Sequence, residues 1–369
     1  MSMSQHFVPL PDLPPPGNSV GPVAWLRSNL FSGWLNTSLT VVAIYILATT
    51  LPPLINWLFI SADWVGEGKE ACDSGGACWV FVANRWDIFI YGFYPKDQTW
   101  RVDLIFAALF VLTAPLFFKQ LPGKLYLGGF ILFIYPLIAF LLMRGGVFGL
   151  EPVETAKWGG FTLTLLLAGV GCIAALPLGV LLALGRQATN MPVVKGMCVL
   201  FIEFWRGVPL ITVLFMSSVM LPLFLPEGVN FDKLLRALIG ITLFQSAYMA
   251  EVVRGGLQAI PKGQYEAADA LGLGYWRKYG LIVLPQALKI VIPGIVNTFI
   301  ALFKDTTLVI IVGLLELLGM VKASLGDPAW PDVSREGYVF AAFMFWIFCF
   351  AMSRYSQWLE RKLHTGHKR

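Results

Sequence analysis

Long apolar segments alternate with short polar ones along most of the chain. Each apolar segment is close to the ~20 residues that an α-helix needs to cross a hydrocarbon layer ~30 Å thick. The pattern predicts about eight membrane spans, at Leu35–Ile60, Asp103–Phe118, Leu125–Met143, Gly159–Leu184, Met197–Leu225, Leu234–Val253, Ala287–Leu318 and Tyr338–Trp358. The fifth and seventh segments are too long for a simple crossing, so we expect these spans to be tilted or broken.

Composition supports a membrane protein. Hydrophobic residues make up 57% of the 369 residues, charged residues 13%, and the mean hydropathy is +0.70. Such values exclude a soluble globular domain of this length. We therefore predict an all-α membrane protein that folds as a polytopic helical bundle.

The distribution of basic residues predicts the orientation. With the N-terminus inside, the cytoplasmic segments carry Arg27, Lys119, Lys124, Arg186, Lys195, Arg254, Lys262, Arg277, Lys278, Arg354, Arg361, Lys362, Lys368 and Arg369. The opposite side has a comparable number of basic residues, but many Asp and Glu residues accompany them. Since short cytoplasmic loops retain Lys and Arg, both termini are predicted to be cytoplasmic. The net charge of +5 then requires no nucleic-acid partner.

The predicted spans divide the chain near Gly149. Residues 1–32 form a cytoplasmic tail, whose Pro-rich stretch is unlike the apolar core of a signal peptide. Residues 33–148 hold three spans and an aromatic-rich periplasmic loop at 61–102, which suits an interfacial belt or a small packed cap. Residues 149–362 hold five spans, and residues 363–369 form a basic tail.

Two cysteines lie in the predicted periplasmic loop. Cys72 and Cys78 flank Gly75-Gly76, whereas the other three cysteines lie in apolar spans. An oxidising periplasm would permit a disulfide between this pair. Two free thiols are the alternative.

A polar connection at 254–285 separates the sixth and seventh spans. Because Ala is small and the strongest helix former, Glu266–Leu271 is predicted to form a short helix with a flat side, ended by Gly272 and Gly274. Glu266 would lie near the helix start, where the dipole favours an acid. This segment suits docking into a groove on a partner; an amphipathic loop along the lipid headgroups is the alternative.

Five motifs, in order, resemble those of the polar amino acid permease family of ABC importers, of the histidine and glutamine type. They are Glu203–Leu210 (E-x-x-R-G-T-P-L, with Val208 for Thr), Tyr248–Gly256 (Y-x-A-E-x-x-R-G-G), Pro261–Gln264, the EAA loop Glu266–Gly274 with Leu284-Pro285, and Lys304–Leu308. The resemblance runs from about Gly159 to Lys362. The length and the added N-terminal spans look closest to the permeases of general L-amino acid importers.

The resemblance implies a type I importer core of five helices with three extra N-terminal helices, in a bacterial inner membrane. It implies a second homologous permease, two ABC ATPase subunits, a periplasmic amino acid-binding protein and an amino acid substrate carried inward. The residues that would couple to the ATPase are Glu266, Ala267, Ala268, Asp269, Leu271, Gly272 and Gly274. The chain has no G-x-x-x-x-G-K-[ST] phosphate loop, so ATP and Mg would be bound by the partner ATPase. We expect no catalysis and no cofactor in this chain.

Acidic residues within the apolar spans require an explanation, since a charge costs about 2.5–3.5 kcal/mol at the centre of a membrane helix. The candidates are Glu203, Glu251, Asp305 and Glu316. Glu203 with Arg206, and Glu251 with Arg254, are three residues apart and share a helical face. We interpret Glu203, Arg206, Glu251, Arg254 and Glu316 as gate residues or structural ion pairs, with substrate contact by Glu251 and Arg254 as the alternative.

A zwitterionic amino acid needs donors for its carboxylate and acceptors for its ammonium group. The seventh span and its neighbour offer such groups at Gln245, Asn297, Lys304, Asp305, Thr306 and Thr307. These residues are candidates for a substrate pathway. Hydrogen bonding between helices is the competing explanation.

Other functions remain open at this level. An ion-coupled secondary amino acid transporter would use the buried acids as ion sites, and an ABC permease for another small polar solute would keep the docking loop. A membrane enzyme is disfavoured because His6, His364 and His367 all lie in the tails, which leaves no histidine for a metal site or general base in the membrane.

Overall fold

The computed structural model describes residues 21–117, 123–147, 149–188, 190–226, 228 and 231–363. Every regular element in these residues is a helix, and the β-pairing found there is limited to isolated bridges, so the all-α prediction is confirmed. Most of the N-terminal tail, nearly all of the C-terminal tail, and Lys119 lie outside the described residues. The three histidines lie outside them as well.

The chain forms two compact units, of which the first comprises residues 1–66 and 70–79. Its described helices are α1 (Pro22–Asn29), α2 (Trp34–Ile55) and the π-helix η1 (Asn56–Ile60). The first predicted span corresponds to α2 with η1, and no residue of α2 is buried. Within this unit a disulfide joins Cys72 to Cys78, with 5.4 Å between their Cα atoms. Backbone hydrogen bonds of Asp63 with Ala77 and Trp79 close the same loop.

The second unit comprises residues 67–69 and 80–369. Its longer helices are α5 (Trp100–Thr113), α7 (Tyr135–Arg144), α8 (Gly160–Gln187), α9 (Pro192–Gly207), α11 (Lys233–Ala259), α14 (Leu284–Asp305) and α16 (Ser334–Leu363). Two short helices, η2 (Lys69–Ala71) and α3 (Trp79–Asn84), lie at the boundary between the units. The other short helices of the second unit are α4 (Trp86–Tyr91), η3 (Lys96–Gln98), η4 (Ala114–Phe117), α6 (Lys124–Gly129), η5 (Phe130–Ile134), η6 (Thr155–Lys157), α10 (Leu210–Phe215), η7 (Met216–Met220), η8 (Leu221–Phe224), α12 (Lys262–Ala270), α13 (Tyr275–Arg277), η9 (Lys278–Val283), η10 (Thr306–Val312) and α15 (Leu317–Leu325).

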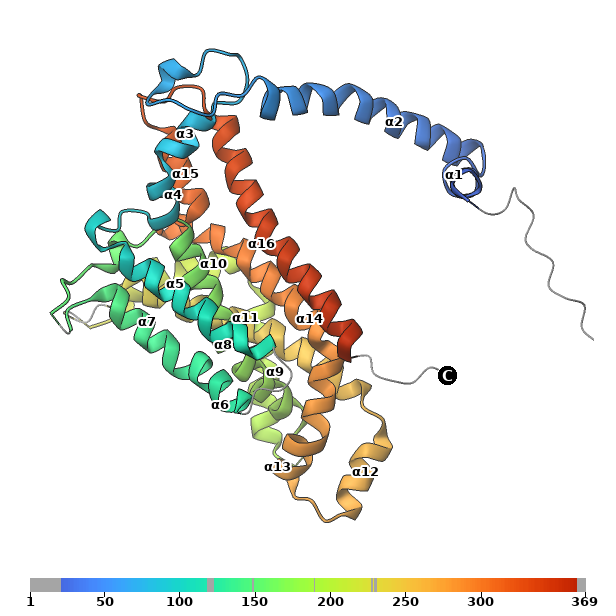
Figure 1. Ribbon diagram of the computed structural model, residues 1–369. Helices are drawn as coiled ribbons and strands as arrows, with labels where there is room; N and C mark the ends of the chain where they lie inside the picture. The colour runs from blue at the N-terminus through green and yellow to red at the C-terminus, as the bar shows by residue number, and fades with distance from the viewer. Residues whose placement is uncertain are drawn as a thin grey trace, which may run out of the picture. The chain divides into compact units, whose positions relative to one another are not determined.

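The parallel pair α8 and α11 forms the centre of this unit and has its most extensive helix contact. Glycines allow the close approach: a Cβ at Gly179 would lie 2.6 Å from Met249 Cβ. In the view of Figure 1, α5 and α7 lie to the left of this pair, and α14 and α16 lie to the right. Both groups of helices therefore cover a common central pair.

Fewer helices are long and apolar enough to span a membrane than the eight spans predicted. Six helical segments in the described residues are long and apolar enough to cross a membrane, or seven when the bent pair α9 and α10–η8 counts as one span. The remaining predicted span is α11, which is 27 residues long but is not among the segments that pass this test. Its buried residues include Arg236, Gln245 and Ser246. These three side chains are buried against neighbouring helices, so protein rather than lipid contacts them.

The fifth predicted span is broken, as its length indicated. Helix α9 ends at Gly207, and the segment that begins at Leu210 is turned from it by 101°. Pro209 explains the break, because a proline forces the preceding residue out of the helical region. Val208 accordingly has φ −113° and ψ 136°.

The boundary between compact units falls near residues 67–80. The reason is that the second and third spans share a hydrophobic core with the five-span half. Ile105 and Tyr135 belong to the same buried cluster as Leu163. The Tyr94 hydroxyl donates to Met143 O over 2.7 Å within this region.

Candidate functional site

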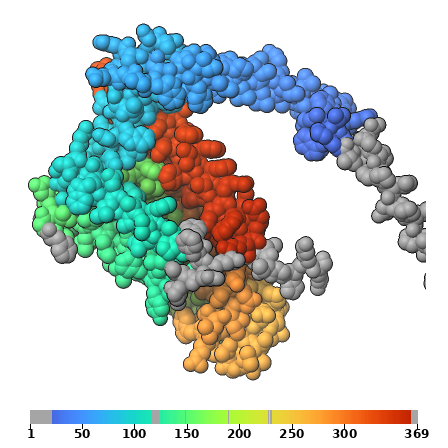
Figure 2. Space-filling model, in the orientation of Figure 1, coloured from blue at the N-terminus to red at the C-terminus, as the bar shows by residue number. Residues whose placement is uncertain are grey.

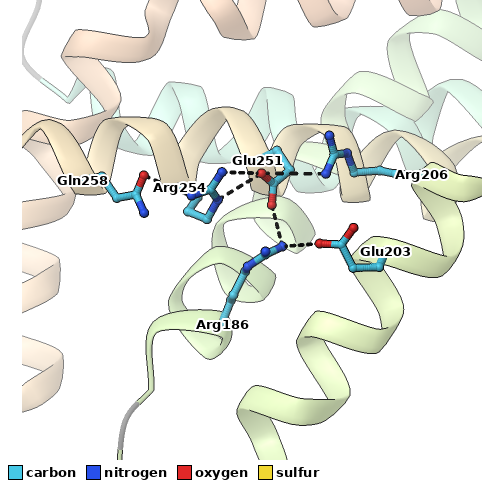
Figure 3. Close-up of polar contacts among 6 residues, drawn as sticks. All are labelled: Arg186, Glu203, Arg206, Glu251, Arg254 and Gln258. Carbon is cyan, nitrogen blue, oxygen red and sulfur yellow. Dashed lines mark hydrogen bonds and ion pairs between the residues drawn. The ribbon is translucent and has the colours of Figure 1, made fainter.

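Five charged side chains meet where α8, α9 and α11 approach one another. We call Arg186, Glu203, Arg206, Glu251 and Arg254 the charge cluster. Figure 3 shows Glu251 at its centre, with Arg186 and Arg206 pointing toward it from the other two helices. Three positive and two negative groups leave the cluster with one net positive charge.

Glu251 is the most connected member of the charge cluster. Its Oε1 accepts a hydrogen bond from Arg186 Nη1 at 2.7 Å, and its Oε2 accepts from Arg254 Nη2 at 2.7 Å and Nε at 3.0 Å. Arg206 Nη1 lies 3.8 Å from Oε2. Only 15% of the Glu251 side chain is exposed. The carboxylate therefore links the ends of three helices through charge-assisted contacts.

The sequence predicted one of these pairs correctly and the other incorrectly. Glu251 pairs with Arg254 as expected, but Glu203 pairs with Arg186 of α8, over 3.0 Å, instead of with Arg206. Arg206 points to Glu251 and lies over the Tyr248 ring. Spacing along α9 suggested that Glu203 pairs within its own helix. The packing of α8 against α9 instead places Arg186 within 3.0 Å of Glu203.

Glu316 is apart from the charge cluster and makes hydrogen bonds in place of an ion pair. It follows the span that ends at Val312, is fully buried, and accepts bonds from Gly319 N at 2.8 Å and Leu318 N at 3.0 Å. It thus caps the N-terminus of α15. Burial raises the pKa of Glu316, against the opposing effect of these backbone donors.

The predicted docking helix is α12. It runs from Lys262 to Ala270 and so begins four residues earlier than predicted. Glu266 therefore lies beyond the first turn, and the prediction that Glu266 interacts with the dipole at the helix start is wrong. Pro261 explains the early start, since proline is favoured at helix N-termini. The end is as predicted: Gly272 has φ +68°, and Leu273 N donates to Ala268 O, which is a Schellman ending.

One side of α12 is held by the chain and the other is exposed. The Tyr265 hydroxyl donates to Leu257 O at 2.9 Å, and Lys278 Nζ lies 2.7 Å from Asp269 Oδ1. Ala268 is fully buried, whereas Glu266 and Leu271 are exposed, Leu271 by 74%. Burial raises the pKa of Tyr265. Figure 2 shows this region projecting beyond the rest of the second unit. The projecting side of α12 is available to a partner.

The predicted pathway residues have different environments. Gln245 is buried and donates to Thr298 O at 2.7 Å, which joins α11 to α14. Thr306 and Thr307, at the start of η10, donate to carbonyls three residues earlier, in the last turn of α14. Asn297 and Lys304 are exposed, and Asp305 is half-buried. The hydroxyls therefore have local helical partners, and the exposed groups face away from the core of this chain.

A pocket of about 150 Å³ lies elsewhere, at the N-terminal end of α11. Its lining is Phe93, Thr155, Ala156, Trp158, Asp232, Lys233, Leu234, Gly313, Leu314, Leu315 and Met320. The Thr155 hydroxyl donates to Asp232, which also caps α11 by accepting from Leu235 N at 3.1 Å. None of these residues was among the sequence candidates. Within the described ranges, no three His, Cys, Asp or Glu side chains gather as metal ligands would.

Sequence reasoning also missed Arg186 as a member of the charge cluster. It was interpreted only as a basic residue at a cytoplasmic helix end. Arg186 lies in the last turn of a long apolar helix, and this helix packs against the one that carries Glu203. That position is the feature of the sequence that could have indicated the pair. The pair of Arg186 with Glu251 could not be inferred from sequence spacing, because the two residues are 65 positions apart.

Comparison with known proteins supplies the family. Residues 175–365 match the family described as "Binding-protein-dependent transport system inner membrane component", and all five motifs lie within this range. The chain belongs to this family. The resemblance stated from the motifs is therefore confirmed, and this inner membrane component is a multi-pass membrane protein.

Two relatives match this inner membrane component over nearly its whole length. It is 58% identical over 365 residues to the inner membrane amino-acid ABC transporter permease protein YhdY of Escherichia coli (strain K12), covering 99% of each chain. It is 42% identical over 424 residues to the glutamate/glutamine/aspartate/asparagine transport system permease protein BztC of Rhodobacter capsulatus, covering 96% of each. A solved amino acid ABC transporter with histidines is 26% identical over 55% of this chain and 92% of its own, with a TM-score of 0.49.

Proposed function

We propose that this chain is the permease subunit of an ATP-driven importer that carries L-amino acids from the periplasm to the cytoplasm. The observation that carries the proposal is α12, a short helix with one exposed side, held by Tyr265 and Lys278 at one end of the second unit. A helix fixed in this way can transmit movement between a partner and the spans on either side. Both full-length relatives are named as amino acid permeases or transport-system permeases, which supports the substrate class.

The proposed coupling path begins at α12 and continues directly into the helices. Helix α11 enters α12 within a few residues, and α13, η9 and α14 follow it as one helical run. Gln286 of α14 donates to Gln264 of α12 at 3.1 Å, so both sides of the connection are joined. Displacement of α12 by an ATPase would therefore move α11 and α14 together.

The remaining partners belong to the same proposal. A second homologous permease would complete the translocation pathway, which explains why Asn297 and Lys304 are exposed in a single chain. Two ABC ATPase subunits would bind ATP and Mg, and a periplasmic amino acid-binding protein would deliver the solute. The family description, which names dependence on a binding protein, supports the last of these.

Affinity purification of the tagged chain in mild detergent, followed by native mass spectrometry and reconstitution into proteoliposomes, tests the proposal. We expect an ATPase pair and a second permease to copurify, and uptake of labelled L-glutamine to require ATP. A chain that transports alone, driven by an ion gradient without ATP, would exclude the proposed function. Copurification of two identical permease chains would replace the expected heterodimer by a homodimer.

A further inference from the structure

Three tyrosines connect the segment around α12 to the ends of the two central helices. Tyr265 lies on α12, Tyr275 on α13 and Tyr279 on η9. The ring centroids of Tyr275 and Tyr279 are 4.6 Å apart, and those of Tyr265 and Tyr279 are 6.2 Å apart. Both separations are typical of paired aromatic rings, so Tyr279 links the other two. We call these three residues the tyrosine stack.

Two hydroxyl groups of the tyrosine stack donate to the last turns of α8 and α11. The Tyr265 hydroxyl donates to Leu257 O at 2.9 Å, and the Tyr275 hydroxyl donates to Leu184 O at 3.4 Å. Each acceptor lies among the last four residues of its helix, where carbonyl groups lack a partner within the helix. Because α8 and α11 run parallel, the tyrosine stack caps both helices at the same end.

A hydrophobic cluster joins the same helix ends. Leu184 of α8 and Leu257 of α11 belong to this one cluster, and Tyr265 and Tyr279 pack against it. Leu184 is 7% exposed and Leu257 is 1% exposed. Close-packed interiors transmit strain, because their side chains cannot shift independently. The tyrosine stack is therefore packed onto a core that α8 and α11 share.

The two central helices differ in how they are connected to α12. Helix α11 ends at Ala259 and α12 begins at Lys262, so the chain itself joins them. Helix α8 ends at Gln187, far from α12 in the chain, so only noncovalent contacts can carry a displacement of α12 to it. The hydroxyl of Tyr275 supplies such a contact directly from the segment that follows α12.

We propose that Tyr275 is a positioning residue that transmits displacement of α12 to the end of α8, where it moves Arg186 relative to Glu203 of α9. The inference rests on the proposed function, because it assumes that an ATPase displaces α12. Leu184 precedes Arg186 by two residues in the last turn of α8. A shift at the Leu184 carbonyl therefore changes the 3.0 Å contact between Arg186 and Glu203. In this way the charge cluster responds to the state of the ATPase.

Uptake and ATP hydrolysis by the reconstituted complex test the role of Tyr275. The variants are Tyr275→Phe and Tyr265→Phe, each of which removes one hydroxyl and keeps the ring. We expect Tyr275→Phe to lower the uptake of labelled L-glutamine per ATP hydrolysed about threefold, as loss of one weak neutral hydrogen bond would. Tyr265→Phe should lower this ratio less, because the chain still joins α11 to α12. Tyr126→Phe is the control and should leave the ratio unchanged, since Tyr126 is 84% exposed.

The order of the two effects separates transmission from simple stabilisation. The bond from Tyr265 is the shorter one, so a role in stability alone predicts the greater loss for Tyr265→Phe. A lower ratio in Tyr275→Phe than in Tyr265→Phe supports the inference. A ratio in Tyr275→Phe that is unchanged, or no lower than in Tyr265→Phe, overturns it.

A native thiol reports movement at the end of α8 without any substitution. A Cβ on Gly185 would lie 2.4 Å from Cys198 Sγ, so this thiol of α9 packs against the last turn of α8. Cys198 is partly exposed. Its rate of alkylation by N-ethylmaleimide, followed by peptide mass spectrometry, should differ between the nucleotide-free complex and the complex with a non-hydrolysable ATP analogue. Tyr275→Phe should reduce this difference.

Equal alkylation rates of Cys198 in the two states of the wild-type complex overturn the inference, even where ATP-dependent uptake is intact. A wild-type complex without ATP-dependent uptake would instead contradict the proposed function itself.

Discussion

Arg186 Nη1 donates to Glu251 Oε1 over 2.7 Å, and this bond joins the last turn of α8 to α11. The same nitrogen donates to Glu203 at 3.0 Å, so Arg186 serves two carboxylates. We expect Arg186→Gln to lower the free energy of unfolding by about 2 kcal/mol, the contribution of a partly buried charged hydrogen bond. Denaturant unfolding of the purified permease in mixed micelles measures this change.

Arg206→Gln is the matched control for this prediction. Arg206 lies 3.8 Å from Glu251, and 36% of its side chain is exposed, so its removal should cost less than about 1 kcal/mol. Double-mutant cycles with Glu251→Gln should give the larger coupling energy for Arg186. Equal coupling energies for the two arginines would show that Arg186 does not organise the charge cluster.

Gly272 ends α12 in a conformation that other residues avoid. Its φ is +68°, and a Cβ there would meet no atom within 4 Å, so the cost of Gly272→Val is conformational and not steric. The left-handed region should destabilise this ending by about 1–2 kcal/mol. We expect the complex to assemble and hydrolyse ATP but to import less solute for each ATP hydrolysed. Parallel assays of hydrolysis and uptake measure this ratio.

Gly272→Asn tests whether conformation is the cause. Asn adopts the left-handed region more readily than a branched residue, so this variant should retain most of the coupling. Loss of coupling in Gly272→Asn to the same degree as in Gly272→Val would argue for a direct contact by the glycine instead.

Glu316 should make the stability of the permease depend on pH. Burial raises the pKa of its folded-state carboxyl group, so the folded protein holds this proton more tightly than the unfolded chain does. The contribution of Glu316 is therefore complete below the ordinary glutamate pKa of about 4.3 and is lost as pH rises through the raised value. We expect wild type to lose stability relative to Glu316→Gln as pH is raised from about 4 to about 7. Parallel pH dependences for the two proteins would contradict this assignment.

The disulfide between Cys72 and Cys78 predicts a labelling pattern. In intact cells with a permeable outer membrane, a membrane-impermeant thiol reagent should label both cysteines only after reduction. Cys72→Ser with Cys78→Ser should remain unlabelled and should lose about 2 kcal/mol of stability in its loop. Labelling confined to inverted vesicles would reverse the predicted orientation of this loop.

Local chemistry made parts of the fold predictable from sequence. The helix end at Gly272 follows from the backbone preference of glycine and occurs as expected. The length of the fifth span indicated that it is tilted or broken, and the structure places the break at Pro209. Spacing also identified the pair of Glu251 and Arg254. Contacts between distant segments were not predictable, because neither Arg186 nor Arg236 has a local pattern that names its environment. Pro261 is an intermediate case: proline favours a helix start, but the Ala-rich stretch that begins at Glu266 is the stronger local signal for a helix.

The polarity of α11 has a consequence for biosynthesis. With Arg236 near one end, Gln245 and Ser246 in the middle, and Glu251 near the other end, this segment partitions poorly into lipid by itself. Its most extensive packing partner is α8, which leaves the ribosome earlier. We therefore expect membrane integration of α11 to require that α8 is already present beside the translocon. The synthesis of α8 before α11 would then help the two helices to pair.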